Sequence, residues 1–371
     1  MNLADMLSYA DISQLNRIAN HYECNCNSRS KRELIQSILH CIHQRATFEQ
    51  TIGQFSLSEI RFLHSIQHER KDTFSIEDLL AKAQLSQCDK TSIGPEQVAN
   101  KLAREMISKF SSLGWLFQGY SQNTRYLYRA PHDLLEKFND VLNQNYQSQL
   151  IYLEQAPPAY RDEQQLLSED MIHFLHFLHQ NKVELTMEGA MYKKFQQILL
   201  DTLHIKEELV HKGDWRFGYG RKVHLYPHRL SLIYDYCYAQ NWIKEENNLL
   251  QLTDRGSKFL HLNKKPEPHE IFIYWLYLYR KPIFNLKSLI IWISKLAYTW
   301  VTLDSLNLIL TPLMRPFYYD SPQSILHQRI IKMLLHQGIL RIGEHPSHGT
   351  VIEITKMGAK LINQMNLHSQ R

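Results

Sequence analysis

The stretch NWIKEENNLLQLTDRGSKFL, residues 241–260, contains a pattern of apolar and polar residues that recurs elsewhere in the chain. A short apolar run, a polar break and a second apolar run precede Thr-x-x-Gly and an apolar helix start. GILRIGEHPSHGTVIEITKMGAKLI, residues 338–362, repeats this order, and GWLFQGYSQNTRYLYRAPHDLLEKF, residues 114–138, gives a weaker copy with Ala-Pro in place of the threonine. We expect two strands joined by a polar turn, after which Thr253 or Thr355 caps the next helix.

Length, charge and cysteine content narrow the class of protein. The 371 residues suggest two to four domains, and 42 Lys plus Arg against 37 Asp plus Glu leave a formal charge of only +5. Nucleic-acid binding must therefore be argued from local patches. Five irregularly spaced cysteines and an N-terminus without a signal peptide predict a cytoplasmic protein. Charges interrupt the apolar region 270–310, so no membrane partner is expected.

Helical periodicity and polar breaks predict a mainly α fold of the α+β class, with tandem winged-helix domains, small antiparallel wings and a helical start. A polar stretch with Pro157-Pro158 predicts a linker, and the NKKPEP run predicts a second boundary. The predicted segments are a helical module at 1–47, a winged-helix domain at 48–142, a linker at 143–167, a second winged-helix domain at 168–262 and a third at 263–371.

The first 47 residues contain two predicted helices. Leu34, Ile38 and Ile42 recur at helical spacing in the second helix, and Ser30 with Glu33 forms a capping box at its start. The pattern resembles the SAP and Rho N-terminal type of helical module, which implies nucleic-acid binding. The alternative is a helical pair that only packs on the next domain.

Residues 48–142 contain three predicted helices followed by the weakest copy of the strand pair, the order of a winged-helix domain. In the third helix, Val98, Leu102, Met106, Phe110 and Leu113 are predicted to face a core. Three cations lie mainly on the opposite, solvent-facing side of this helix. A recognition helix uses that side to contact phosphates or bases. These candidate nucleic-acid-binding residues are Lys101, Arg104 and Lys109.

The segment at 171–203, with Leu185-Thr186-x-x-Gly189 and Tyr192-Lys193-Lys194, and the segment at 229–260 resemble the helicase-associated domain of bacterial proteins related to the XPB type of helicase. The resemblance covers 168–262 and implies a winged-helix accessory module. It does not extend to a motor, because Gly213-DWRF-Gly218 is followed by Tyr219 and not by the lysine of a phosphate loop.

The sharpest local feature is KGDWRFGYGRKVHLYPHR, residues 212–229, where cations and aromatic residues alternate. Cations neutralise phosphates and exposed rings stack on bases, so this loop predicts a nucleic-acid site. A β-hairpin packed on a core would show the same alternation. The candidate binding residues here are Lys212, Trp215, Arg216, Tyr219, Arg221, Lys222 and Arg229.

In the last module, Arg329 and Lys332 share the polar side of a helix predicted at 323–337, which makes that helix a second candidate recognition helix. An ordinary solvated helix face would look similar.

Two groups of residues suggest metal sites, and both are incomplete. His173, His176 and His179 lie outside the apolar face of their helix, with no Cys or carboxylate set nearby. His21, Cys24, Cys26 and Cys41 include a Cys-x-Cys spacing tighter than zinc sites use. No metal, cofactor or catalytic residue is therefore predicted.

The leading hypothesis is a non-enzymatic DNA-binding accessory protein for transcription, replication or repair, with RNA as an alternative nucleic acid. A competing hypothesis is an interaction adaptor for a helicase or RNA polymerase, since winged helices also bind proteins. An enzyme with a scattered active site is a third alternative.

Overall fold

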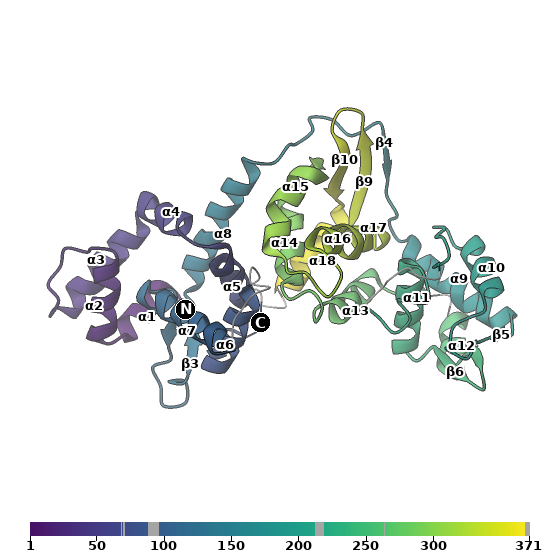
Figure 1. Ribbon diagram of the computed structural model, residues 1–371, viewed down its shortest axis with the longest axis horizontal. Coiled ribbons are helices and arrows are strands. Elements are labelled where there is room, and N and C mark those ends of the chain that lie inside the picture. Colours follow the sequence, from purple (N-terminus) through teal and green to yellow (C-terminus); the bar gives the residue numbers. More distant parts are fainter. Residues whose placement is uncertain (68, 70, 88–95, 212–218, 263, 368–371) are drawn as a thin grey trace. The chain divides into compact units, whose positions relative to one another are not determined.

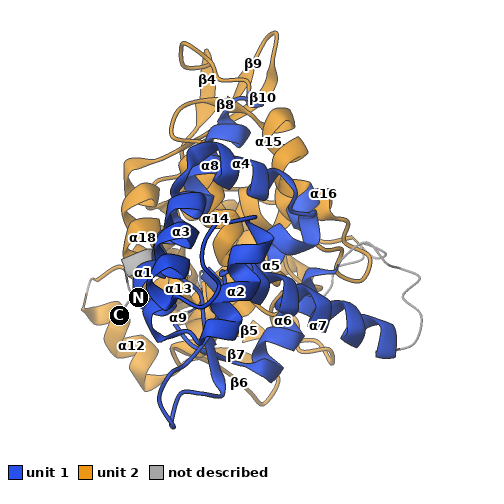
Figure 2. Ribbon diagram, turned by 90° about the vertical axis from the view of Figure 1, so that its left-hand side faces the viewer, with its two compact units in different colours: residues 1–150, 312–314, 365–371 blue, residues 151–311, 315–364 orange. Residues whose placement is uncertain are grey.

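The computed structural model describes residues 1–371 apart from 68, 70, 88–95, 212–218, 263 and 368–371 (Figure 1). The described residues are mainly helical and form three small antiparallel sheets of three or four strands, which confirms the predicted fold class. Two compact units divide the chain (Figure 2): unit 1 contains 1–150, 312–314 and 365–371, and unit 2 contains 151–311 and 315–364.

Unit 1 begins with four short helices, α1 (Leu3–Tyr9), α2 (Ile12–His21), α3 (Lys31–His43) and α4 (Arg45–Gly53). The side chain of Ser30 accepts a hydrogen bond from the Glu33 amide, which is one of the two bonds of the predicted capping box; the Ser30 amide donates to the Asn27 carbonyl and not to Glu33. Leu15, Ile18, Leu34 and Ile38 are buried between the helices. The predicted helical start is confirmed.

The rest of unit 1 has the order helix, strand, helix, helix, strand, strand, helix. Its elements are α5 (Leu57–Gln67), β1 (Phe74–Ser75), α6 (Ile76–Ser86), α7 (Glu96–Ser112), β2 (Phe117–Gln118), β3 (Leu127–Arg129) and α8 (His132–Gln147). The strand order is β1-β3-β2. Phe55, Phe110, Trp115 and Phe138 form an aromatic cluster in its core, with ring centroids 5.4 to 6.5 Å apart.

The first part of unit 2 repeats this order. Its elements are α9 (Leu166–Gln180), β5 (Val183–Glu184), α10 (Lys193–Thr202), α11 (His228–Ala239), β6 (Ile243–Glu246), β7 (Leu249–Leu252) and α12 (Asp254–His261). The strand order β5-β7-β6 matches that of unit 1, since the first strand again pairs with the third.

The second part of unit 2 repeats the order once more, after helix α13 (Pro268–Tyr279). The elements are α14 (Leu286–Leu296), β8 (Val301–Thr302), α15 (Leu303–Leu310) and the short helix η1 (Thr311–Leu313), then a continuous helical run of α16 (Pro322–Ser324), the π-helical η2 (Ile325–Ile331) and α17 (Lys332–His336). The strands β9 (Leu340–His345) and β10 (Gly349–Ile354) and the helix α18 (Lys356–Leu367) follow. Residues 312–313 of η1 and 365–367 of α18 are counted with unit 1. The sheet order is β4-β9-β10-β8, with β4 (Ala159–Arg161) added at one edge.

The repeated Thr-x-x-Gly step closes both strand pairs of unit 2. Thr253 Oγ1 accepts from the Gly256 amide at 3.0 Å and donates to the Asn241 carbonyl at 2.6 Å. Thr355 makes the same two bonds, at 2.9 and 2.7 Å. A Cβ on Gly256 would lie 2.0 Å from the carbonyl oxygen of Trp242, so only glycine allows this close approach. The predicted helix caps are confirmed.

The segment predicted as a linker, 143–167, contributes to folded structure along most of its length. Helix α8 continues to Gln147, and β4 pairs with β9 through Tyr160 and Gly343. Glu163 is fully buried. This stretch therefore holds part of the core of unit 2 as well as connecting it to the preceding helix.

None of the helices in the described part of the chain combines the length and the apolar composition that a membrane crossing requires.

Candidate nucleic-acid interface and a buried ionic cluster

Helix α7 in unit 1 presents two of its predicted cations to solvent. Lys101 is 77% exposed and lies 3.9 Å from Glu105 one turn along the helix. Arg104 is also exposed, and within the described residues it makes no ion pair. Exposed pairs such as Lys101 with Glu105 are worth about 0 to 1 kcal/mol, so both cations remain available to an external phosphate.

The third cation of α7 has an internal partner. Lys109 Nζ lies 2.6 Å from Glu59 Oε1 and 5.6 Å from the ring centre of Phe55. Its side chain is partly exposed, but its charge is balanced inside the unit. The helix also differs from the prediction at Val98, which is 42% exposed, whereas Phe110 is buried as predicted.

The residues of the predicted basic and aromatic loop have different surroundings. Lys212, Trp215 and Arg216 lie outside the described residues. Tyr219 is only 2% exposed and packs against Tyr279 and Phe317, so the prediction that its ring stacks on a base is wrong. The alternative, a β-hairpin packed on a core, is correct for the burial of Tyr219 only, because residues 219–227 contain no strand.

Arg221 and Lys222 share one carboxylate, that of Glu245. Arg221 Nη2 lies 3.3 Å from Glu245 Oε1, and its guanidinium carbon is 3.8 Å from the ring centre of Tyr238. Lys222 Nζ donates to the Gly189 carbonyl at 2.7 Å and is nearly buried. Arg221 keeps about half of its side chain exposed, at 48%, whereas Lys222 is held within the fold. The binding prediction for Lys222 is therefore contradicted by its burial.

Arg229 forms the centre of a buried ionic cluster and is fully inaccessible to solvent. Its Nη2 donates to Asp170 Oδ2 at 2.6 Å, and its Nη1 donates to Glu163 Oε2 at 2.5 Å and to the His336 carbonyl at 3.1 Å. The prediction that Arg229 contacts nucleic acid is wrong, because its guanidinium is already bonded to two carboxylates and a carbonyl. We call Arg229, Asp170, Glu163 and His336 the buried ionic cluster.

The carboxylates of this cluster have further donors. Asp170 Oδ1 accepts from the His204 amide at 2.8 Å and lies 2.8 Å from His204 Nδ1. Glu163 also pairs with Arg161 and lies 3.0 Å from His336 Nδ1. Burial raises the pKa of Glu163, but the hydrogen bond and charge of His336 and the charges of Arg229 and Arg161 outweigh it and hold that pKa below its usual range.

The last module buries its predicted contact residue as well. Arg329 is 4% exposed; its Nε donates to Asp320 Oδ2 at 3.0 Å and its Nη1 lies 3.1 Å from His228 Nδ1. Arg329 therefore stabilises the fold and does not face solvent as predicted. Lys332 is partly exposed.

These contacts join the two helices that stand third in the two repeats of unit 2. Helix α11 packs against α17, and Arg229 on α11 bonds to the carbonyl of His336 on α17. His228 on α11 meets Arg329 on η2. The third helices of unit 2 are therefore locked to each other, whereas α7 in unit 1 keeps an exposed polar side.

Helix α11 also buries a carboxylate that forms no ion pair with any of the described residues. Asp235 is 1% exposed; its Oδ2 accepts from the Arg221 amide at 3.0 Å, and its Oδ1 has no hydrogen-bond partner. Burial raises the pKa of Asp235 to about 7, against the lowering effect of that amide and of the Arg221 and Lys222 charges.

The two groups suspected of binding metal are not arranged for it. Within the described part of the chain, no group of three or more His, Cys, Asp or Glu side chains is placed to hold an ion. His173, His176 and His179 are exposed along α9, and the ring of His173 contacts that of His204. Cys24 Sγ and Cys41 Sγ are 3.2 Å apart, as a contacting thiol pair.

Sequence patterns did not identify Glu163, Asp170, His204 or His336 as a cluster. One usable signal was present: Asp170 lies three residues after Leu167 and four before Phe174, on the apolar face of α9. A charged residue on such a face needs a buried partner. The partner itself is 59 positions away, which periodicity does not reveal.

Comparisons with protein-family models, with curated proteins and with solved structures found no match to this chain.

Proposed function

We propose that this protein binds duplex DNA through the module at 48–142, with α7 as the helix that approaches the phosphates. The observation that carries this proposal is the exposure of Lys101 and Arg104 on α7, whereas the counterpart helices in unit 2 bury Arg229 and Arg329. Cations without an internal role remain free to neutralise phosphates and release counterions.

The element order supports a winged-helix interpretation of all three repeats. Each has three helices with a strand between the first two, then a strand pair in which the last strand lies centrally. In a winged helix the third helix enters the major groove and the strand pair lies beside it. Helix α7 holds this third position in unit 1, and the pair β2 and β3 follows it directly.

In this proposal unit 2 does not contact DNA through its third helices. Its two repeats form one body fastened by the buried ionic cluster, so α11 and η2 would have to separate before either could enter a groove. Separating them would expose Arg229 and two carboxylates that are now paired. Unit 2 therefore acts as an accessory body, as the resemblance to a helicase-associated domain implies.

The test removes the two exposed cations of α7 in the full-length chain. Lys101→Gln combined with Arg104→Gln should weaken binding to a 20-bp duplex about tenfold and reduce the salt slope by about 2, since each phosphate contact contributes about 0.9. Fluorescence anisotropy across a salt series measures both quantities.

The matched control removes two exposed cations from α10 in unit 2, as Lys193→Gln with Lys194→Gln. This variant should bind DNA within twofold of the unchanged protein. Equal losses in both variants would mean that net charge, and not α7, determines binding. An A-form RNA duplex of the same sequence should bind more weakly, because its major groove is too narrow for a helix.

A second candidate function rests on exposed apolar side chains of unit 2. Ile151 is 50% exposed and Tyr298 is 58% exposed, and the ring of Tyr298 lies 5.4 Å from that of Tyr152. We infer that these three residues offer a surface to a protein such as a helicase or RNA polymerase. Binding to purified RNA polymerase that survives nuclease and is lost in Tyr298→Ser would support it; binding lost with nuclease would reject it.

A further inference from the structure

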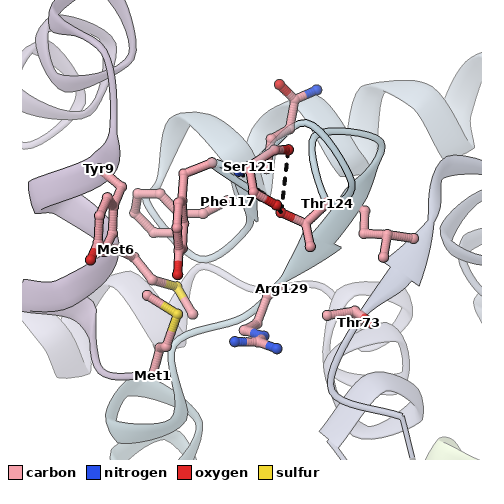
Figure 3. A pocket seen from close by; sticks show the side chains of 12 residues that line it. Met1, Met6, Tyr9, Thr73, Phe117, Ser121, Thr124 and Arg129 are labelled. Carbon is pink, nitrogen blue, oxygen red and sulfur yellow. Dashed lines mark hydrogen bonds between the residues drawn. The ribbon is translucent and has the colours of Figure 1, made fainter.

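Unit 1 contains a pocket between α1 and the strand pair β2–β3, with a volume of about 170 Å³ (Figure 3). Its apolar lining includes Met6, Phe117 and Leu127, and its polar lining includes Thr73, Thr124 and Arg129. For comparison, an apolar cavity of about 150 Å³ holds one benzene molecule. The pocket is therefore large enough for a single ring.

Arg129 has the charged side chain among the residues that line this pocket. Figure 3 shows its guanidinium between the side chains of Met1 and Thr73. Its Nε is buried and has no hydrogen-bond partner, and no carboxylate pairs with Arg129 within the described residues. A buried donor without a partner is costly, and a guanidinium binds a carboxylate through two parallel hydrogen bonds.

One side of the pocket is formed by the turn at residues 119–124. Ser121 Oγ lies 2.7 Å from Thr124 Oγ1, and a Cβ on Gly119 would lie 2.3 Å from the carbonyl oxygen of Thr124, so the turn needs glycine there. At the edge of the pocket, the rings of Tyr9 and Tyr120 stack with centroids 4.0 Å apart. Both are more than half exposed, so aromatic faces border the entrance.

We propose that this pocket binds a small aryl monocarboxylate. The carboxylate lies on the guanidinium of Arg129, and the ring lies against Met6 and Phe117, where apolar contact replaces water. The site is independent of the DNA-binding proposal, because it uses none of the cations of α7. Its occupant would bridge α1 and the strand pair that follows α7.

The experiment uses the full-length protein with three aryl carboxylates, namely benzoate, salicylate and phenylacetate, and with benzamide as a neutral counterpart of benzoate. At least one carboxylate should bind with a dissociation constant of about 1 mM or lower, the range expected for so few atoms. Benzoate should bind at least tenfold more tightly than benzamide. Saturation-transfer NMR measures binding without requiring DNA.

Two variants and the NMR signals of two methionines test whether the carboxylate binds in this pocket. Arg129→Gln should abolish the preference for carboxylate without lowering the midpoint of thermal unfolding, because Nε has no partner to lose. Arg125→Gln, which changes an exposed cation on the same turn, should leave binding unchanged. In protein labelled with ¹³C-methyl methionine, benzoate should shift the Met6 signal and leave that of Met333, buried in unit 2, in place.

Three outcomes would overturn the proposal: equal affinity for benzamide and benzoate, unchanged carboxylate binding in Arg129→Gln, or no binding of any of the three carboxylates at 10 mM, a concentration about tenfold above the expected constant. A shift of Met333 in place of Met6 would also assign the binding to another site. None of these results changes the expectation for DNA, which is measured separately on α7 variants.

Discussion

Helices α7 and α11 hold the same place in their repeats and have opposite surroundings. In α11 every residue from His228 to Cys237 is buried, including the cation Arg229. In α7 the cations Lys101 and Arg104 are exposed. Position in a repeated topology therefore does not determine which helix can contact a ligand. What decides it is whether the cations of the helix already have partners inside the protein.

The partners of Arg229 explain why it can be buried. Its side chain meets the carboxylates of Asp170 and Glu163, and those carboxylates receive further bonds from His204 and His336. Such a cluster repays the cost of desolvation only when nearly every donor and acceptor is used. Among the described residues, the exposed cations of α7 have no comparable set of partners.

The largest expected effect comes from removing the central cation. Arg229→Met leaves two buried carboxylates without their main counter-charge and should lower the free energy of unfolding by about 3–5 kcal/mol. Urea denaturation of the full chain, followed by the fluorescence of the buried Trp275 and Trp292 in unit 2, measures the loss.

Lys101→Met on α7 is the matched control and should change the stability by less than about 0.5 kcal/mol, because its side chain is exposed. Replacing Glu163 by Gln and Asp170 by Asn together with Arg229→Met should recover part of the loss, since no unpaired buried carboxylate then remains. Equal stability of Arg229→Met and Lys101→Met would contradict the claim that the cation of α11 stabilises the fold and that of α7 does not.

A middle-sized effect should depend on pH. Because burial raises the pKa of Asp235 to about 7, the folded state keeps a proton that the unfolded chain releases near pH 4. The stability that this proton provides is present below about pH 4 and is lost as the pH rises through about 7. Glu163, whose pKa is lowered, behaves oppositely: its contribution is present above its ordinary pKa and is lost on further acidification.

Asp235→Asn keeps an oxygen to accept the Arg221 amide and removes the ionisable group. The stability advantage of the variant over the unchanged protein should grow by about 3 kcal/mol between pH 5 and pH 8, since about two pH units lie between pH 5 and the folded-state pKa of about 7 and each unit corresponds to about 1.4 kcal/mol. Urea denaturation at the two pH values gives the difference. The same change in stability at both would show that Asp235 does not titrate in this range.

The smallest effect concerns the way in which each strand pair ends. Thr253→Ala and Thr355→Ala should each cost about 1 kcal/mol, because each removes a side-chain cap of the next helix. In unit 1 the corresponding helix begins after Pro131, which has no side-chain cap. Pro131→Ala should therefore cost less than either threonine change in urea denaturation. A larger loss for Pro131→Ala would contradict this difference.

Local sequence patterns predicted most of the helices and their order. The helix predicted at 323–337 is observed as the continuous run of α16, η2 and α17 over 322–336, and the Thr-x-x-Gly step marks the end of both strand pairs in unit 2. These features depend on neighbouring residues, through periodicity, capping and glycine contacts. They could be predicted because their partners are close in sequence.

The candidate site was predicted less well, for a physical reason. Alternating cations and aromatic residues suit an exposed binding loop and a packed core equally, and Tyr219 and Arg229 belong to a core. The carboxylate of Glu163 that pairs with Arg229 is 66 positions away, and the His336 carbonyl is 107 positions away. Only the folded arrangement shows which cations have internal partners and which, like Arg104, face solvent.

Hydrogen exchange with and without duplex DNA most directly tests the contrast between α7 and α11. On addition of DNA, peptides from Gln97–Ser112 and from the strand pair β2–β3 should exchange more slowly, whereas peptides from α11 and η2 should keep the same slow exchange. Slower exchange of α11 or η2 with no change in α7 would contradict it, because the locked helices would then be the ones that respond to DNA.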